Sequence, residues 1–146
     1  MDIQSATRRY VLEDADIAAA LGQRFYPIKL PQNVVYPAMT MQRISGVRFG
    51  DLRGPAGLAR PRYQFDIWAR ELEGEANALE VSRLGRLLLA RLEGKTTRLE
   101  DDSVSPVEQR IVGFEFIDDE ESFEPGVNGG YFRYTSDFYI WHQTGR

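Results

Sequence analysis

The clearest alternation of hydrophobic and polar residues in the chain runs from Gly129 to His142. Every second residue there falls on one face, which carries Phe132, Tyr134, Ser136, Phe138 and Ile140. The opposite face includes tyrosines and a tryptophan, whose rings can be buried while a polar atom stays hydrated. A period of two predicts a β-strand. We expect this strand to be central in a sheet, with its second face covered by a helix or by another subunit.

Two stretches repeat with the period of an α-helix instead. Residues 3–12 form one helix, and a short second helix capped by Asp14 or Asp16 runs through Ala20 to a C-cap at Gly22. The stripe of the first helix is Ile3, Ala6, Thr7, Tyr10 and Val11. Residues 72–93 form the main helix, whose predicted buried stripe is Ala76, Leu79, Leu84, Leu87, Leu88 and Leu92.

Burial of the five leucines in that stripe, at roughly 2 kcal/mol each, contributes on the order of 10 kcal/mol, so the main helix is expected to be the chief support of the sheet. Gly85 lies in the middle of this helix, where glycine costs about 1 kcal/mol relative to alanine. We expect a sheet or a neighbouring helix to approach closely at this point.

Further strands are predicted at residues 24–28, 37–45, 62–70 and 107–117. The segment 46–61 holds four glycines and two prolines, which favours a long loop over a helix or a ladder. The strands at 37–45 and 62–70 and the loop between them suggest an extended antiparallel hairpin whose tip projects from the body of the domain. Residues 118–130 hold five carboxylates and three glycines and are expected to be an exposed, mobile loop.

These elements indicate an α+β fold: a single domain over residues 1–146, with a mainly antiparallel sheet of about four to five strands packed by one long helix and an N-terminal helix pair. Hydrophobic residues at 42% and charged residues at 27% are typical of a soluble globular domain. No apolar run approaches the ~20 residues that span a bilayer, and the N-terminus has no signal-peptide pattern. The absence of cysteine excludes disulfides and thiolate metal sites and fits a reducing compartment.

Charge is distributed unevenly along the chain. The net charge is −4, which argues weakly against general nucleic-acid binding. Residues 1–70 hold ten Lys/Arg and six Asp/Glu, a balance of +4, and residues 71–146 hold eight and sixteen, a balance of −8. The two halves are either solvated faces or surfaces that suit head-to-tail packing of identical subunits.

Candidate catalytic chemistry is sparse. The single histidine, His142, shares its strand with Ser136 and Asp137, but those two side chains point to opposite faces. The acidic segment lacks the order of a calcium loop, and the glycine-rich segment lacks a phosphate-loop lysine. Phosphate binding by the arginines of that segment stays open. We expect no enzyme, no cofactor and no metal site.

The order of the elements resembles a known family. The similarity extends over nearly the whole chain, through segments at 22–27, 42–46, 54–60, 63–69, 123–125 and 136–142. Gly54–Arg60 and Ile140-Trp141-His142 are its most specific parts. The chain resembles the tail-completion or tail-terminator proteins of long-tailed bacteriophages and phage-like particles, which join head and tail.

This resemblance implies a virion structural protein that is assembled in the host cytoplasm and forms a ring, typically a hexamer, at the head-proximal end of the tail tube. There it would stop tube polymerisation and contact the head connector or stopper, while DNA passes through the lumen without specific binding. A head-closure or stopper protein of the same neck is the nearest alternative. A small-ligand module using Trp68, Tyr139 and Trp141 as a pocket is another.

Two charged clusters are the candidate interface residues. The basic cluster, at the expected loop tip, would contact another subunit or the tail and consists of Arg43, Arg48, Arg53, Arg60 and Arg62. The acidic cluster consists of Asp118, Asp119, Glu120, Glu121 and Glu124. It would meet the basic cluster across the ring, face the tube and connector, or line the lumen and repel DNA phosphate.

Overall fold

The computed structural model describes residues 2–51, 54–70, 76–126 and 129–144. The helices are α1 (Ile3–Leu12), α2 (Ala15–Leu21) and α3 (Ala76–Leu92). The strands are β1 (Phe25–Pro27), β2 (Ala38–Ser45), β3 (Arg48–Asp51), β4 (Gly54–Ala59), β5 (Arg62–Arg70), β6 (Thr96–Asp101), β7 (Glu108–Gly126) and β8 (Gly129–Gln143).

Strand β8 is the centre of the sheet. One edge of β8 pairs with β5 and then with the end of β4, and its other edge pairs with β7 over almost its full length. The alternation predicted for this strand is confirmed, because Ser136, Phe138 and Ile140 are fully buried. Because β8 is hydrogen-bonded along both edges and buried on one face, it determines where the neighbouring strands and the helices lie.

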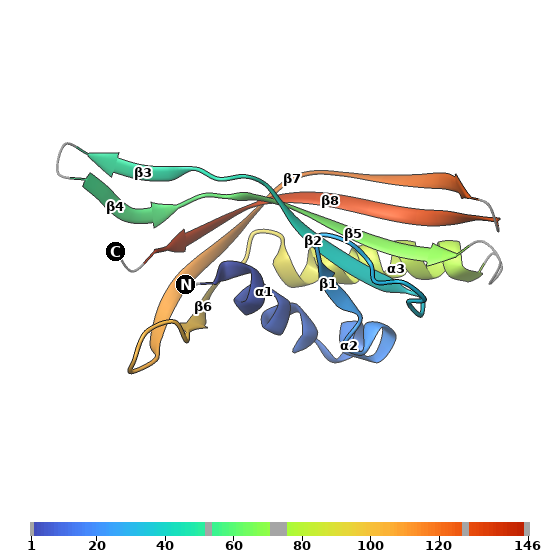
Figure 1. The fold of residues 1–146 in the computed structure, drawn as a ribbon, viewed down its shortest axis with the longest axis horizontal. Coiled ribbons are helices and arrows are strands. Elements are labelled where there is room, and N and C mark those ends of the chain that lie inside the picture. Colours follow the sequence, from blue (N-terminus) through green and yellow to red (C-terminus); the bar gives the residue numbers. More distant parts are fainter. Residues whose placement is uncertain (1, 52–53, 71–75, 127–128, 145–146) are drawn as a thin grey trace.

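The segment 46–61 is not a loop, and that expectation was wrong. It forms β3 and β4, which pair with each other from Arg48↔Ala59 to Asp51↔Gly54. Strand β3 continues the direction of β2, and β4 leads into β5, so the four strands form one long hairpin. Its β3–β4 end projects at the left of Figure 1, and β2 and β5 lie in the body of the sheet. Glycine has no side chain to pack and proline has no backbone N–H to donate, so both residues weaken a strand. The remaining backbone groups of β3 and β4 still form the ladder.

The expected acidic loop is also a strand. Residues 118–126 are the distal half of β7 and pair with β8 from Asp118↔Asp137 to Gly126↔Gly129. A bulge lies between Phe116 and Asp118 and changes which residues face each side. The ladder persists because β8 supplies a hydrogen-bonding partner at each step, which outweighs the low strand propensity of Asp and Glu.

Strand β6 was not predicted at all. It pairs antiparallel with the first part of β7, from Thr96↔Gly113 to Asp101↔Glu108. Asp101 is 1% exposed. It accepts hydrogen bonds from Ser103 and from Arg110 Nε at 3.0 Å, which ties the turn to the strand pair.

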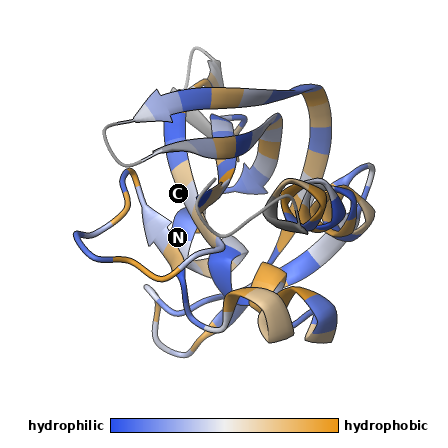
Figure 2. Cartoon of the chain, turned by 90° about the vertical axis from the view of Figure 1, so that its right-hand side faces the viewer, coloured by the Kyte–Doolittle hydropathy of each residue, from blue (hydrophilic) through white to orange (hydrophobic). Residues whose placement is uncertain are grey.

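The predicted fold class therefore needs correction. Over the described residues the chain forms an eight-stranded sheet with three helices, instead of four to five strands packed by one long helix. Figure 2, which looks along the long axis, shows that the sheet curls and that hydrophilic and hydrophobic bands alternate along its strands. The added strands come from the two segments interpreted as loops and from β6.

All three helices lie on the same side of the sheet in Figure 1. The N-terminal pair matches its prediction: Asp14 caps α2, Gly22 ends it with a φ of 58°, and the stripe of α1 is buried except for the partly buried Tyr10. The large side chains between helices and sheet are Val11, Ile17, Leu21, Phe25, Met39, Met41, Phe65, Ile67, Leu84, Leu88, Leu92, Phe138 and Ile140.

Helix α3 confirms most of its predicted stripe. Leu84, Leu88 and Leu92 are buried and Leu87 is partly buried, but Leu79 is 73% exposed. Val81, which the prediction omitted, takes the place of Leu79 in the core. Residues 71–75 and the side chain of residue 76 lie outside the described part of the chain. The stripe is thus displaced at its N-terminal end, where the helix reaches the end of the sheet.

Candidate functional site: the open face of the sheet

The second face of β8 carries no helix in the described part of the chain, because α1, α2 and α3 all pack on the other side. We call this surface the open face. It is formed by alternate residues of β5, β8 and β7: Arg62, Gln64, Asp66, Trp68, Tyr131, Arg133, Thr135, Asp137, Tyr139, Trp141, Glu115, Asp118, Glu120, Ser122 and Glu124. Of the two covers expected for this face, the helix is not found in the described part of the chain, and cover by another subunit stays a prediction.

An ion-pair network crosses the middle of the open face. Arg133 donates from Nε to Asp66 Oδ1 at 2.8 Å and from a terminal nitrogen to Glu124 Oε1 at 2.6 Å, so it ties β8 to strands on both sides. Thr135 also donates to Asp66, at 2.6 Å. Burial alone would lower the pKa of Arg133, but the two carboxylates outweigh it and raise that pKa. These charges are therefore paired, and they link β5, β8 and β7 across the face.

Arg62 and Asp137 form a second pair. Arg62 donates from both Nε and a terminal nitrogen to Asp137 Oδ2, the former at 3.2 Å. The hydrogen bonds that Arg62 donates to the Asp137 carboxylate raise the pKa of Arg62. Asp118 lies opposite Asp137 in the ladder. The cation therefore also offsets the repulsion between these two neighbouring carboxylates.

Aromatic rings and one cation join the long hairpin to β8. The rings of Phe49 and Trp141 stack with centroids 5.6 Å apart and planes at 3°. The guanidinium of Arg60 lies 4.4 Å from the Tyr139 ring centroid and 5.1 Å from that of Trp141. Stacked cations of this kind contribute about 0.5–2 kcal/mol. Arg60 thus fastens the root of the β3–β4 hairpin to the sheet.

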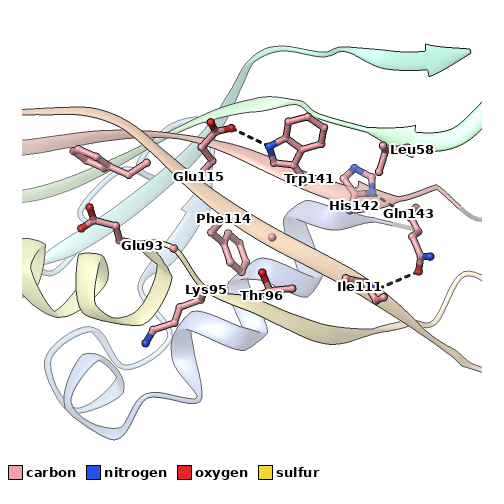
Figure 3. Close-up of a pocket in the computed structure, with 13 residues that line it drawn as sticks. Leu58, Glu93, Lys95, Thr96, Ile111, Phe114, Glu115, Trp141, His142 and Gln143 are labelled. Atoms are coloured by element: carbon pink, nitrogen blue, oxygen red, sulfur yellow. Dashed lines mark hydrogen bonds between the residues drawn. The ribbon is translucent and has the colours of Figure 1, made fainter.

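A groove of about 720 Å³ opens beside these rings, where β4, β6, β7 and β8 meet. Figure 3 shows its lining side chains, among them Leu58, Ile111, Phe114 and Trp141. Trp141 Nε1 donates to Glu115 at 2.9 Å, and the backbone amide of Ile111 donates to Gln143 at 3.1 Å. Leu58 and Ile111 are 37% and 44% exposed, so the groove presents apolar surface to solvent.

His142 lines the same groove, but among the described residues its ring has no hydrogen bond to a carboxylate or to a nucleophilic side chain. It is 7% exposed, its burial lowers its pKa, and its Nδ1 lies 3.2 Å from the carbonyl of Gln143. Within residues 2–51, 54–70, 76–126 and 129–144, no three His, Asp or Glu side chains are grouped so as to hold a metal ion. None of the helices described is both long and apolar enough to cross a bilayer.

The aromatics proposed as a small-ligand pocket do not meet. Trp68 lies across from Arg133, whereas Tyr139 and Trp141 are six and eight residues farther along β8. At a rise of about 3.3 Å per residue, Trp68 and Trp141 are about 26 Å apart. The geometry removes that pocket as an alternative.

A family model described as "Tail completion protein gp17" matches residues 6–143 of the chain. The chain belongs to this family of tail completion proteins. A solved structure titled "Virion of native gene transfer agent (GTA) particle" contains a chain of the same fold, with a TM-score of 0.65, 15% identity, and coverage of 96% of this chain and 93% of that one. No curated protein sequence matches.

The chain is accordingly a structural protein of a phage tail, at the junction of tail and head. This family assignment confirms the resemblance drawn from the ordered segments of the sequence.

The structure separates the basic residues that the sequence grouped together. Arg43 and Arg48 are exposed, whereas Arg60 and Arg62 fold onto the open face and are engaged there. Arg53 lies outside the described residues. The two inward arginines join the strands to β8, whereas Arg43 and Arg48 are exposed and have no ion-pair partner among the described residues.

The acidic residues are also divided between the two faces. Asp119 accepts a hydrogen bond from the Tyr134 hydroxyl at 2.8 Å, and Glu121 accepts one from Ser82 of α3 at 2.8 Å, so both point to the helix side. Asp118, Glu120 and Glu124 belong to the open face, and Glu124 pairs with Arg133. Alternation along β7, displaced by its bulge, produces this division.

Sequence reasoning missed Arg133 and Asp66 as the central pair of the open face. Both were assigned to the correct faces of their strands, but the register that makes them neighbours is long-range. Opposite charges on two predicted strands were the available signal, and they do not specify which residues pair.

Proposed function

We propose that this protein forms a ring, of six copies, at the head-proximal end of the tail tube, where it stops tube polymerisation and joins the tail to the head connector. Residues 1–146 act as one domain in this role, without catalysis, cofactor or metal. The observation that carries the proposal is that exposed Arg48 of the long hairpin and exposed Glu120 of distal β7 are separated along the sheet. Arg48 aligns through Ala59 with His142, and Glu120 pairs with Thr135, seven residues earlier along β8.

The two hairpins project at opposite ends of the long axis of the molecule in Figure 1. The long hairpin of β2–β3 and β4–β5 carries the exposed Arg43 and Arg48. The β7–β8 hairpin carries the exposed Asp118 and Glu120. A contact between the basic end of one copy and the acidic end of the next is heterologous, and such contacts close into a ring when the rotation permits.

Charge complementarity favours this contact over alternatives in which like ends meet. In the ring, Arg43, Arg48 and Arg53 supply the basic partner, and Arg60 and Arg62 keep the hairpin in position. The acidic partner is Asp118 and Glu120 of the open face. Of the other acidic residues, Glu124 is paired with Arg133, and Asp119 and Glu121 face the helices. The tail tube protein and the head connector are the partners above and below, and DNA passes through the lumen without specific binding.

Electron microscopy of particles that lack this protein tests the proposal. We expect overlong tails, or tails of normal length that fail to join heads. A monomer in isolation does not contradict the proposal, because such subunits can close a ring only on their template. Particles that lack the chain and still have joined tails of normal length would contradict it.

A head-closure component would give a different phenotype in the same particles. Tails would then keep their normal length and remain able to join, and the defect would be found in heads that fail to retain DNA. The family match to tail completion proteins favours the first outcome.

A further inference from the structure

A small polar pocket lies where the β3–β4 hairpin leaves the body of the sheet. Its volume is about 220 Å³. Arg43 of β2 is the register partner of Tyr63 in β5, and Arg48 of β3 aligns through Ala59 with His142 of β8. Residues paired in this way share a face of the sheet, and all five line the pocket. The pocket is therefore built from four strands, on the face opposite the open face.

The polar side chains of this pocket lack partners. Tyr63 is 5% exposed, and its hydroxyl forms no hydrogen bond with a described residue. His142 is 7% exposed, and its ring has one hydrogen-bonding contact among the described residues, with the carbonyl of Gln143. Arg43 and Arg48 are exposed and form no ion pair in that part of the chain. A nearly buried hydroxyl without a partner is costly, and a ligand that accepts its hydrogen bond would remove that cost.

The electrostatics of the pocket favour a single negative charge. Burial raises the pKa of Tyr63, Arg43 opposes that rise and Asp2 adds to it. Burial is also the main cause that lowers the pKa of His142, to which Arg48 contributes, so this imidazole is neutral at pH 7. Asp2 lines the pocket but already accepts two hydrogen bonds at the start of α1. Two guanidinium groups and one carboxylate leave one positive charge without a counterpart.

We propose that this pocket binds a carboxylate group, supplied by Glu120 of a second copy of this chain. Arginine binds a carboxylate through charge-assisted hydrogen bonds, and a tyrosine hydroxyl donates one more. A carboxylate on a narrow side chain can reach the nearly buried Tyr63 and His142. A phosphate of DNA is flanked by sugars on both sides and cannot enter in this way, and the net charge of −4 also disfavours DNA.

Glu120 suits this role because it is exposed and has no ion-pair partner among the described residues. The open face around it is acidic, with six carboxylates against two arginines. Glu120 pairs with Thr135, seven residues before His142 along β8. At a rise of about 3.3 Å per residue this is about 23 Å, and the odd spacing puts Glu120 on the opposite face. Glu120 therefore cannot fill the pocket of its own chain.

The inference rests on the proposed ring and defines its subunit contact. The pocket and the open face are different surfaces of the molecule, so a contact between them repeats head to tail, as a ring requires. This contact also provides the subunit cover that the sequence predicts for the second face of β8.

The single histidine of the chain makes the pocket observable by NMR. Acetate, compared with chloride at equal ionic strength, should shift the ring signals of His142 and raise its pKa, because a nearby carboxylate stabilises the imidazolium form. Arg48→Gln and Tyr63→Phe should each weaken acetate binding about threefold or more. Arg98→Gln, at an exposed site outside the pocket, is the control and should leave the affinity unchanged.

Two outcomes of the titration would overturn the carboxylate site. One is an acetate affinity that is the same in all of these variants. The other is a response of the His142 signals to a DNA oligonucleotide or to inorganic phosphate where acetate has none, which would assign the pocket to a phosphate.

The absence of cysteine allows the occupant to be identified in joined particles. Gly46→Cys places a thiol at the pocket, where a Cβ would have Arg43 at 3.6 Å. Ser122→Cys places a second thiol on the open face, two residues from Glu120, and leaves that carboxylate intact. A short bismaleimide should link copies that carry both changes into a ladder of multimers ending at a closed ring. The control pairs Gly46→Cys with Ala90→Cys, exposed on α3, and should stay monomeric.

The outcomes separate this inference from the proposed function. If the ladder is absent, or if Gly46→Cys links to a different virion protein, a second copy does not occupy the pocket and the inference is wrong, while the ring proposal stands. If particles without the protein join normally, the proposed function itself fails, whatever the acetate titration reports.

Discussion

The Cα of Gly85 lies directly against the ring of Tyr134. A Cβ at position 85 would stand 3.0 Å from three ring atoms of Tyr134. The ring has little freedom to move, because Tyr134 is 4% exposed and its hydroxyl donates to Asp119 at 2.8 Å. The close approach expected from a mid-helix glycine is thereby confirmed, and it fixes the distance between α3 and β8.

Gly85→Ala should therefore destabilise the protein by about 1 kcal/mol, although alanine is the better helix former by about 1 kcal/mol. Urea denaturation measures the change. In a Tyr134→Ala background the ring is absent, and the same substitution should stabilise the protein by about 1 kcal/mol relative to that background. Equal effects in both backgrounds would mean that the ring is not the cause.

Two leucines of α3 should respond in opposite ways to a charge. Leu88 is 1% exposed and Leu79 is 73% exposed, although the sequence pattern assigned both to the buried stripe. Leu88→Asp should prevent soluble folding, because an unpaired carboxylate would be placed in the core. Leu79→Asp should fold with a change within about 0.5 kcal/mol. Amide NMR dispersion of the two variants decides the matter, and a well-dispersed spectrum for Leu88→Asp would refute the packing.

Acid should weaken the β6–β7 turn through Asp101. The hydrogen bond from Ser103 lowers the pKa of Asp101 to about 2, with a further contribution from Arg110. Because the folded pKa lies below the usual 3.8, the stabilisation is complete above pH 4 and is lost as the pH falls toward 2.

Asp101→Asn should lower the free energy of unfolding at pH 7 by about 2 kcal/mol and flatten its pH dependence between pH 4 and pH 2. Chemical denaturation across that range measures both effects. Asp102→Asn, at an exposed neighbouring carboxylate, is the control and should keep the wild-type slope. An unchanged slope in Asp101→Asn would exclude this residue as the source.

The attachment of the β3–β4 hairpin to β8 should depend on the planar shape of the Arg60 guanidinium group as well as on its charge. Arg60→Lys keeps the charge but loses the stacking over Tyr139 and Trp141, which we expect to cost about 1 kcal/mol and to loosen the β3–β4 hairpin. Faster amide exchange in β4 and a shift in Trp141 fluorescence would report this. Arg43→Lys, at an exposed position, should change neither signal. If both variants behave alike, the stack does not hold the hairpin.

Charge reversal on the two hairpins should show compensation. Arg48→Glu should reduce head–tail joining, because it places like charges at the proposed subunit contact. Glu120→Lys should do the same, and the two together should restore part of the yield. The control Lys29→Glu changes the net charge as Arg48→Glu does, but at another exposed site, and should leave head–tail joining unchanged. Joining yields counted by electron microscopy that fail to recover in the double variant would argue against contact between these two residues.

Local pattern was enough to identify several elements of this protein. The buried face of β8, the helix pair with its cap at Asp14, and most of the stripe of α3 follow from periods of 2 and 3.6 and from capping chemistry. The family also followed from the sequence, because the resemblance rested on an ordered set of short segments, and a family model matches residues 6–143. These properties depend on residues close together in the chain.

Tertiary structure alone decided the rest. The segments at 46–61 and 118–126 have compositions typical of loops, and they become strands because β8 or a neighbouring strand offers a ladder that local propensity cannot foresee. Register then determines that Arg60 and Arg62 turn inward and that Asp119 and Glu121 face the helices. Strand pairing joins residues that are far apart in sequence. Its stabilising contacts are made with residues on other strands, which a short stretch of sequence does not include.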